Sequence, residues 1–245
     1  MSRPRQAQRA FLLLAGCLGL GCAMTGSYQS ARVLEKGTSS IGLSFGVNRV
    51  STGDSQVIIP TIIPEVSYHA GLEENLEVGG RIAPSSLGLE GDVKYRFLHR
   101  HGWHAALAPS LSYQGLFFMS GVTAGVPVIA TRDFSDVFGF NLAAFGTYTN
   151  LSSGDKDISD VLKKIGGDVG TWGFCLGPEI HSGNFFMRPL VEFDRSYPLS
   201  GGEDKWSPFN RLSVVAQFGW VLESEKQQLD RIEKKLDEAR PPQSK

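Results

Sequence analysis

The chain has 245 residues, of which 41% are hydrophobic and 20% are charged, and its formal net charge is -1 at pH 7. This balance excludes the basic surface expected of a nucleic-acid-binding protein. An aromatic content of 10% and recurring apolar segments exclude disorder for most of the chain. Beyond residue 22 there is no run of about 18 apolar residues, which excludes a bundle of transmembrane helices.

Residues 1–22 have the pattern of a secretory signal peptide. Arg3, Arg5 and Arg9 form a basic head without any acidic residue, and residues 10–21 are apolar or small apart from Cys17. A short apolar stretch behind a basic head is typical of an export signal and is too short to remain as a membrane span.

Two cysteines are candidates for lipid attachment. The Leu-Ala-Gly sequence before Cys17 resembles the bacterial lipobox, whose cysteine is diacylated and becomes the first residue of the mature chain. Cys22 follows a longer apolar run but has glycine where the lipobox prefers leucine. Cleavage after Ala23 without a lipid is the alternative. Only Cys175 lies deep in the mature chain, so no disulfide framework is expected.

Residues 39–221 alternate between apolar and polar positions. In residues 87–97 the odd positions are apolar, aromatic or glycine, whereas four of the even positions carry charges. Alternation with a period of two sends these two sets to opposite faces of a strand. Residues 103–113 and 212–220 follow the same pattern.

The alternating segments predict about ten strands. They lie at roughly 39–49, 57–69, 74–83, 86–97, 102–114, 117–131, 136–149, 169–181, 184–196 and 209–222. Most are longer than the five or six residues (roughly) of strands in soluble proteins and match the roughly 9–11 residues of a tilted membrane-spanning strand. The fold class expected is therefore all-β, an antiparallel up-and-down transmembrane β-barrel.

Aromatic residues near the strand ends form two expected belts, as at the two interfaces of a bilayer. One belt is Tyr68, Tyr95, Phe97, Trp103, Phe138, Phe185 and Trp220, and the other is Tyr113, Phe117, Tyr148, Trp172, Tyr197 and Trp206. A soluble lipocalin-like barrel, with apolar side chains inside, is the alternative, but strand length and the belts favour the membrane.

Connections near 70–73, 98–101, 132–135 and 182–183 are short, whereas 51–56, 151–168 and 198–207 are expected to be longer loops at the other end. Outer-membrane barrels have short periplasmic turns and long outer loops. An even number of strands then places both termini on the periplasmic side, where an N-terminal lipid would lie.

Residues 71–79, Gly-Leu-Glu-Glu-Asn-Leu-Glu-Val-Gly, resemble a hairpin that is common in small bacterial outer-membrane barrel proteins, most of them uncharacterised. Residues 92–97 resemble the strand ending that follows in those proteins, and residues 31–37 are similar to their entry segment after a lipid-modified cysteine. The resemblance implies localisation and fold rather than chemistry. The chain departs from it because Phe218 and Trp220 are followed by a polar tail, whereas the usual assembly signal is a terminal aromatic.

The polar faces of the strands predict a charged lumen. Its expected members are Glu65, Glu77, Arg81, Glu90, Asp92, Lys94, Arg96, Glu179, Arg188, Glu192 and Asp194. Buried charges must pair or stay hydrated, so Arg81 is expected to pair with Glu90 and Asp92, and Arg188 with Glu192 and Glu179. A lumen filled by these pairs implies a structural envelope protein, whereas a hydrated one implies a narrow transporter or channel.

An outer-membrane hydrolase acting at the extracellular rim is the alternative function. All five histidines fall near the predicted periplasmic side, and no nucleophile–base pair stands out, so the protein is not expected to be an enzyme. His99, His101 and His104 lack companion ligands at metal-binding spacing and are interpreted as solvated turn residues. No metal or cofactor is expected.

The chain is thus divided into a signal peptide (1–22), a periplasmic entry segment (23–38), the barrel (39–222) and a tail (223–245). Leu229, Ile232, Leu236 and Ala239 recur at helical spacing, which predicts a short C-terminal helix. The expected partners are outer-membrane lipid, the barrel-assembly machinery and a periplasmic protein bound through that helix.

Overall fold

A computed structural model describes residues 28–52, 55–60, 64–84, 87–116, 119–156, 159–160, 162, 166–200 and 208–223. The signal peptide, with both candidate lipid-attachment cysteines, and the predicted C-terminal helix lie outside these residues. Within the part that is described, no helix is long and apolar enough to cross a membrane.

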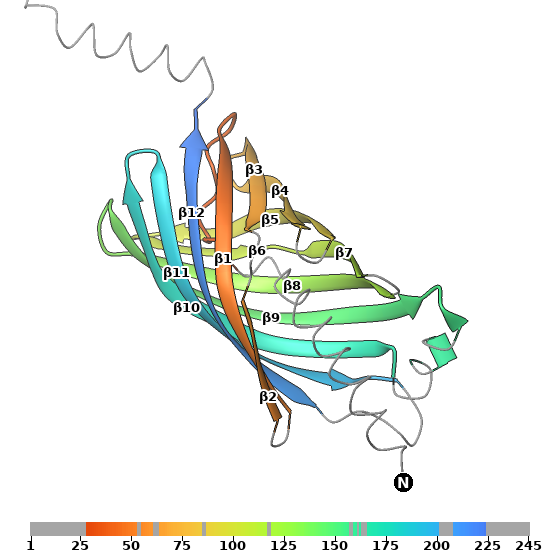
Figure 1. Cartoon of the computed structure of the whole chain (residues 1–245). Helices are drawn as coiled ribbons and strands as arrows, with labels where there is room; N and C mark the ends of the chain where they lie inside the picture. Colours follow the sequence, from red (N-terminus) through yellow and green to blue (C-terminus); the bar gives the residue numbers. More distant parts are fainter. Residues whose placement is uncertain are drawn as a thin grey trace, which may run out of the picture.

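Twelve antiparallel strands form one sheet that closes on itself (Figure 1). They are β1 (Ser39–Thr52), β2 (Ser55–Pro60), β3 (Glu65–Glu73), β4 (Leu76–Ala83), β5 (Gly88–Arg100), β6 (Trp103–Leu107), β7 (Ser110–Leu116), β8 (Met119–Asp133), β9 (Phe138–Ser153), β10 (Asp168–Ser182), β11 (Phe185–Pro198) and β12 (Phe209–Leu222). Closure comes from β1, which pairs with β12 from Ser39↔Leu222 to Ser51↔Asn210. This pairing leaves no open edge between the first and last strands of the barrel.

Two of the predicted strands are each divided in the structure. Both β2 and β3 pair with β1, and both β6 and β7 lie between β5 and β8. The β6–β7 interruption falls at Ala108 and Pro109, because proline has no backbone N–H to donate. Hydrogen bonds from Ala108 N to Pro127 O (3.0 Å) and from Val93 N to Pro109 O (3.1 Å) still hold this segment between its neighbours. The architecture is therefore a ten-stranded antiparallel barrel, as the alternation predicted.

The barrel is apolar outside and polar inside. On β5 the outward Leu89 is 59% exposed, whereas the next residue, Glu90, is 2% exposed. Outward Val214 and inward Ser213 on β12 show the same contrast. This polarity is the reverse of a lipocalin-like soluble barrel and is typical of a barrel whose outer surface meets lipid.

Aromatic side chains gather at both rims. Phe185, Trp220, Ile41 and Tyr68 are successive register partners across β11, β12, β1 and β3. At the opposite rim the exposed aromatics are Tyr113, Tyr148, Trp172 and Tyr197. The two predicted belts are thus present, apart from Phe117 and Trp206, which lie outside the described residues.

Short connections share the end of the barrel where β1 begins and β12 ends. The turns after β3, β5, β8 and β10 lie there, as predicted. At the other end the sequence prediction needs one correction: Ser51, Thr52, Ser55 and Gln56 belong to paired strands and not to a loop, because β1 and β2 pair as far as Thr52↔Ser55. The long connections at this end follow β9 and β11.

Candidate functional site

The lumen holds most of the charges that the sequence placed there. Nine of the predicted residues are buried on inward strand positions: Glu65, Glu77, Arg81, Glu90, Asp92, Lys94, Glu179, Glu192 and Asp194. Arg188 also faces inward, where its guanidinium donates to Glu179 Oε1 at 2.8 Å from Nε. This last contact is one of the predicted pairs.

Arg96 lies at the rim rather than in the lumen. Its Nη2 donates to the backbone oxygen of Glu74 (2.7 Å) and to Asn75 Oδ1 (3.1 Å) in the turn between β3 and β4. Arg96 lies just past the Leu76↔Tyr95 register pair, where β4 begins, so the turn lies within its reach. Arg96 therefore fastens a turn instead of lining the lumen.

Glu192 pairs with Arg211, not with Arg188 as the sequence suggested. Arg211 Nε donates to Asp194 Oδ2 at 2.6 Å, and its Nη2 contacts Glu192 Oε1. All three residues are at most 1% exposed. Arg211 lies opposite Asp194 in the β11–β12 register, two positions before Ser213, so the alternation could have identified it.

Arg81 is the centre of a second buried cluster. It lies opposite Glu90 in the β4–β5 register, as predicted, and its Nη1 is 3.6 Å from Glu65 Oε2. Its Cζ is also 5.2 Å from the centre of the Tyr28 ring, a cation–π geometry. Tyr28 belongs to the N-terminal segment, which is defined here as residues 28–38.

The N-terminal segment runs inside the barrel. Tyr28, Gln29, Ser30 and Ala31 are at most 4% exposed. The backbone N–H of Ala31 donates to Thr131 Oγ1 on β8 at 2.8 Å. From the sequence, these residues were assigned to a periplasmic entry segment, because residues 31–37 resemble the entry segment of small outer-membrane barrel proteins.

Further contacts hold this segment to two separate strands of the barrel wall, β4 and β8. Leu34 N donates to Glu77 Oε2 on β4 at 2.9 Å, and Arg32 Nη2 donates to Asp133 Oδ1 at the end of β8 at 2.6 Å. His104 is buried and lies 2.8 Å from the other oxygen of Asp133. His104 is therefore a lumen residue and not a solvated turn residue as predicted.

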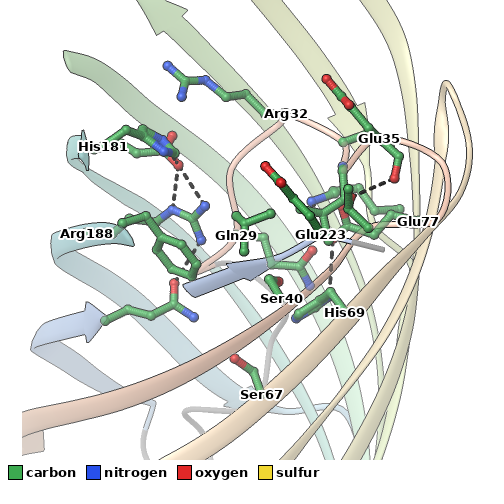
Figure 2. Close-up of a pocket in the computed structure, with 18 residues that line it drawn as sticks. Gln29, Arg32, Glu35, Ser40, Ser67, His69, Glu77, His181, Arg188 and Glu223 are labelled. Atoms are coloured by element: carbon green, nitrogen blue, oxygen red, sulfur yellow. Dashed lines mark hydrogen bonds and ion pairs between the residues drawn. The ribbon is translucent and has the colours of Figure 1, made fainter. Parts of the chain in front are cut away.

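A cavity of about 470 Å³ remains between the segment and the wall, at the end of the barrel where β1 begins and β12 ends. Figure 2 shows Gln29 between two groups of side chains, with His181 and Arg188 on one side and His69 and Glu77 on the other. In the first group, Glu179 Oε1 is 2.7 Å from Arg188 Nη2 and 2.9 Å from His181 Nε2. In the second, Glu77 Oε1 is 2.7 Å from Lys94 Nζ and 3.3 Å from His69 Nδ1.

Gly79 makes room for His69 beside the cavity. A Cβ on this glycine would lie 2.0 Å from His69 Nδ1, closer than atoms can approach. The position of the His69 ring therefore requires a residue without a side chain at position 79, which faces His69 in the β3–β4 register.

Among the described residues, no group of three or more His, Cys, Asp and Glu side chains is arranged to hold a metal ion. Cys175 is a free, buried thiol on the inner face of β10.

No protein-family model matches the sequence, and no curated protein matches it. The structure is similar to Ail, the attachment invasion locus protein of Yersinia pestis (13% identity, 76% of this chain and 99% of that chain, TM-score 0.34). It is also similar to an outer membrane channel from Pseudomonas putida F1 (8% identity, 80% and 98%, TM-score 0.46). A third similar structure is the translocator domain of the autotransporter NalP from Neisseria meningitidis (10% identity, 88% and 97%, TM-score 0.43).

Proposed function

We propose that this protein is an integral β-barrel lipoprotein of the bacterial outer membrane with a structural, non-catalytic role in the envelope. The apolar exterior and its two aromatic rims support a membrane location. An export signal and the candidate lipid-attachment residues Cys17 and Cys22 support the outer membrane rather than another compartment. The start of β1 and the end of β12, which share one end of the barrel, then lie on the periplasmic side, next to the lipid anchor.

The observation that carries the structural role is the closure of the lumen by the N-terminal segment. Tyr28 and Ala31 are at most 1% exposed inside the barrel, and the Glu192–Arg211–Asp194 cluster is equally buried. Side chains that exclude water to this degree fill the cross-section of a narrow barrel. A filled, ion-paired lumen stabilises the barrel and does not conduct.

A non-catalytic role agrees with the surroundings of the lumen histidines. His69, His104 and His181 each lie within 3.3 Å of a carboxylate that another group also binds: Lys94 at Glu77, Arg32 at Asp133 and Arg188 at Glu179. These histidines are members of ion-paired walls at the end of the barrel where β1 begins and β12 ends. An extracellular hydrolase would need such groups at the other end.

A narrow transporter is the second candidate, and the cavity favours it. About 470 Å³ of space already exists at one end of the lumen, next to the segment that fills the rest. Transport would require this segment to leave the barrel.

The two roles are separated by the efflux of entrapped glucose from liposomes that contain the refolded protein. In a structural barrel, Arg81→Ala lowers the free energy of unfolding and leaves glucose inside. In a transporter, wild-type liposomes lose glucose and Arg81→Ala changes the rate. Labelling with radioactive palmitate in cells, with Cys17→Ala and Cys22→Ala as matched variants, tests the lipid anchor and identifies the modified residue.

A further inference from the structure

The cavity next to the N-terminal segment has the features of a binding site, and Gln29 is its most informative residue. The Gln29 side chain lines the cavity and the residue is 4% exposed. Neither its Oε1 nor its Nε2 has a hydrogen-bond partner among the described residues. Burying an amide without partners costs roughly 1–3 kcal/mol, so buried polar groups are normally satisfied. The amide offers two donors and an acceptor to whatever occupies the cavity.

The three cations that line the cavity are each paired with a carboxylate, and Glu35 and Glu223 add two further carboxylates to the lining. Lys94 is 2.7 Å from Glu77, and Arg188 is 2.7 Å from Glu179. Arg32 is 2.6 Å from Asp133. Because each cation has its own carboxylate, an anionic ligand would find no uncompensated cation here. A neutral ligand can still use the remaining lone pairs and N–H groups of these pairs.

Neutral donors and acceptors complete the lining. Ser40 and Ser67 contribute buried hydroxyls, and Gln217, which accepts from Arg188 Nη1 at 3.1 Å, contributes a second amide. Each sugar hydroxyl both donates and accepts, which matches a wall of amides, hydroxyls and ion pairs. Phe186 adds an apolar ring for the C–H groups of a sugar.

We propose that this cavity binds a neutral polyhydroxyl solute of the mono- or disaccharide class. A volume of about 470 Å³ lies within the roughly 300–1,000 Å³ of small-molecule sites. The proposal goes beyond the structural role and does not depend on it, since a barrel that does not conduct can still hold a solute at its mouth.

The test is isothermal titration of the refolded full chain with glucose and sucrose, in a zwitterionic detergent without a sugar headgroup. Glucuronate and glucosamine serve as charged probes of the same shape. We expect saturable binding of at least one neutral sugar, at least tenfold tighter than either charged probe. Saturation by neither neutral sugar at about 100 mM, a concentration far above the millimolar range of weak sites, overturns the proposal. Tighter binding of a charged probe also overturns it.

Gln29→Leu is the informative variant, because leucine keeps the volume and removes the unpartnered amide. We expect its affinity for the sugar to fall about tenfold or more, and its thermal unfolding temperature to stay equal or rise. Ser112→Ala is the matched control, since Ser112 is buried in the lumen on β7 and does not line the cavity; its affinity should equal that of the wild type. Wild-type affinity in Gln29→Leu contradicts the assignment. Glucose efflux from liposomes reports on the structural role separately, so the two failures are distinguishable.

Discussion

Ala31 and Thr131, 100 residues apart in the chain, are joined by a hydrogen bond of 2.8 Å from the Ala31 backbone N–H to Thr131 Oγ1. Thr131 Oγ1 in turn donates to Asn141 Oδ1 at 2.6 Å, and Asn141 Nδ2 donates to Glu179 Oε2 at 3.2 Å. A continuous polar path thus links the N-terminal segment, two strands and the wall of the cavity. Thr131 has a central place in it, because its one hydroxyl serves three partners, the third being Ser30 Oγ at 3.3 Å.

Thr131→Val removes that hydroxyl and keeps the shape of the side chain. It leaves the Ala31 N–H and the Asn141 carbonyl oxygen buried without their partner, so we expect the free energy of unfolding to fall by about 1–3 kcal/mol. Urea unfolding in liposomes measures the change. Thr123→Val, on the same strand but only partly buried against Thr149, is the control and should cost less. Equal losses in the two variants would contradict the role given to Thr131.

Arg211→Met leaves Glu192 and Asp194 buried without a cation. Breaking a buried ion pair on one side typically costs about 3–5 kcal/mol, and we expect a loss of this size in the same unfolding assay. Combining the change with Glu192→Gln and Asp194→Asn removes the orphaned charges and should restore most of the stability. Arg195→Met, at an exposed position of β11, should have little effect. A triple variant no more stable than Arg211→Met would argue against charge burial as the cause.

Val214→Arg tests which face meets lipid. Val214 is 56% exposed on the outer face of β12, midway along the strand. If that face lies in the hydrocarbon of a bilayer, an arginine there costs about 2–4 kcal/mol. Asn184→Arg, in the exposed turn between β10 and β11, should leave the free energy of unfolding unchanged. A neutral Val214→Arg variant in liposomes would indicate that water, not lipid, covers this surface.

The barrel was predictable from the sequence because successive side chains of each strand point alternately to the lipid-facing and the lumen-facing side. Leu89 and Glu90 differ in exposure simply because they point to opposite faces, and one residue type suits each face. The same rule placed nine charges in the lumen. The same rule predicts an inward side chain for Arg211, which lies at an even spacing from the inward residues Ser213 and Gln217 on β12.

Partner choice inside the lumen was less predictable. Arg188 and Glu192 lie on the same strand, β11, and their four-residue separation spans roughly 13 Å. The partner of Glu192 comes instead from β12, whose register places Arg211 opposite Asp194. The position of the N-terminal segment was not predictable at all. Its contacts with Thr131 and Glu77 join residues far apart in sequence, and an irregular segment has no period that reveals a buried face.

Single-channel conductance of the refolded full chain in a planar lipid bilayer tests the closure of the lumen most directly. After insertion has been confirmed by heat-modifiable migration of the barrel, we expect no discrete steps from the wild type. Deletion of residues 28–36 removes the side chains that fill the lumen, and this variant should give reproducible steps. Steady conductance steps from the wild type, or silence from the inserted deletion variant, would contradict closure of the lumen by the N-terminal segment.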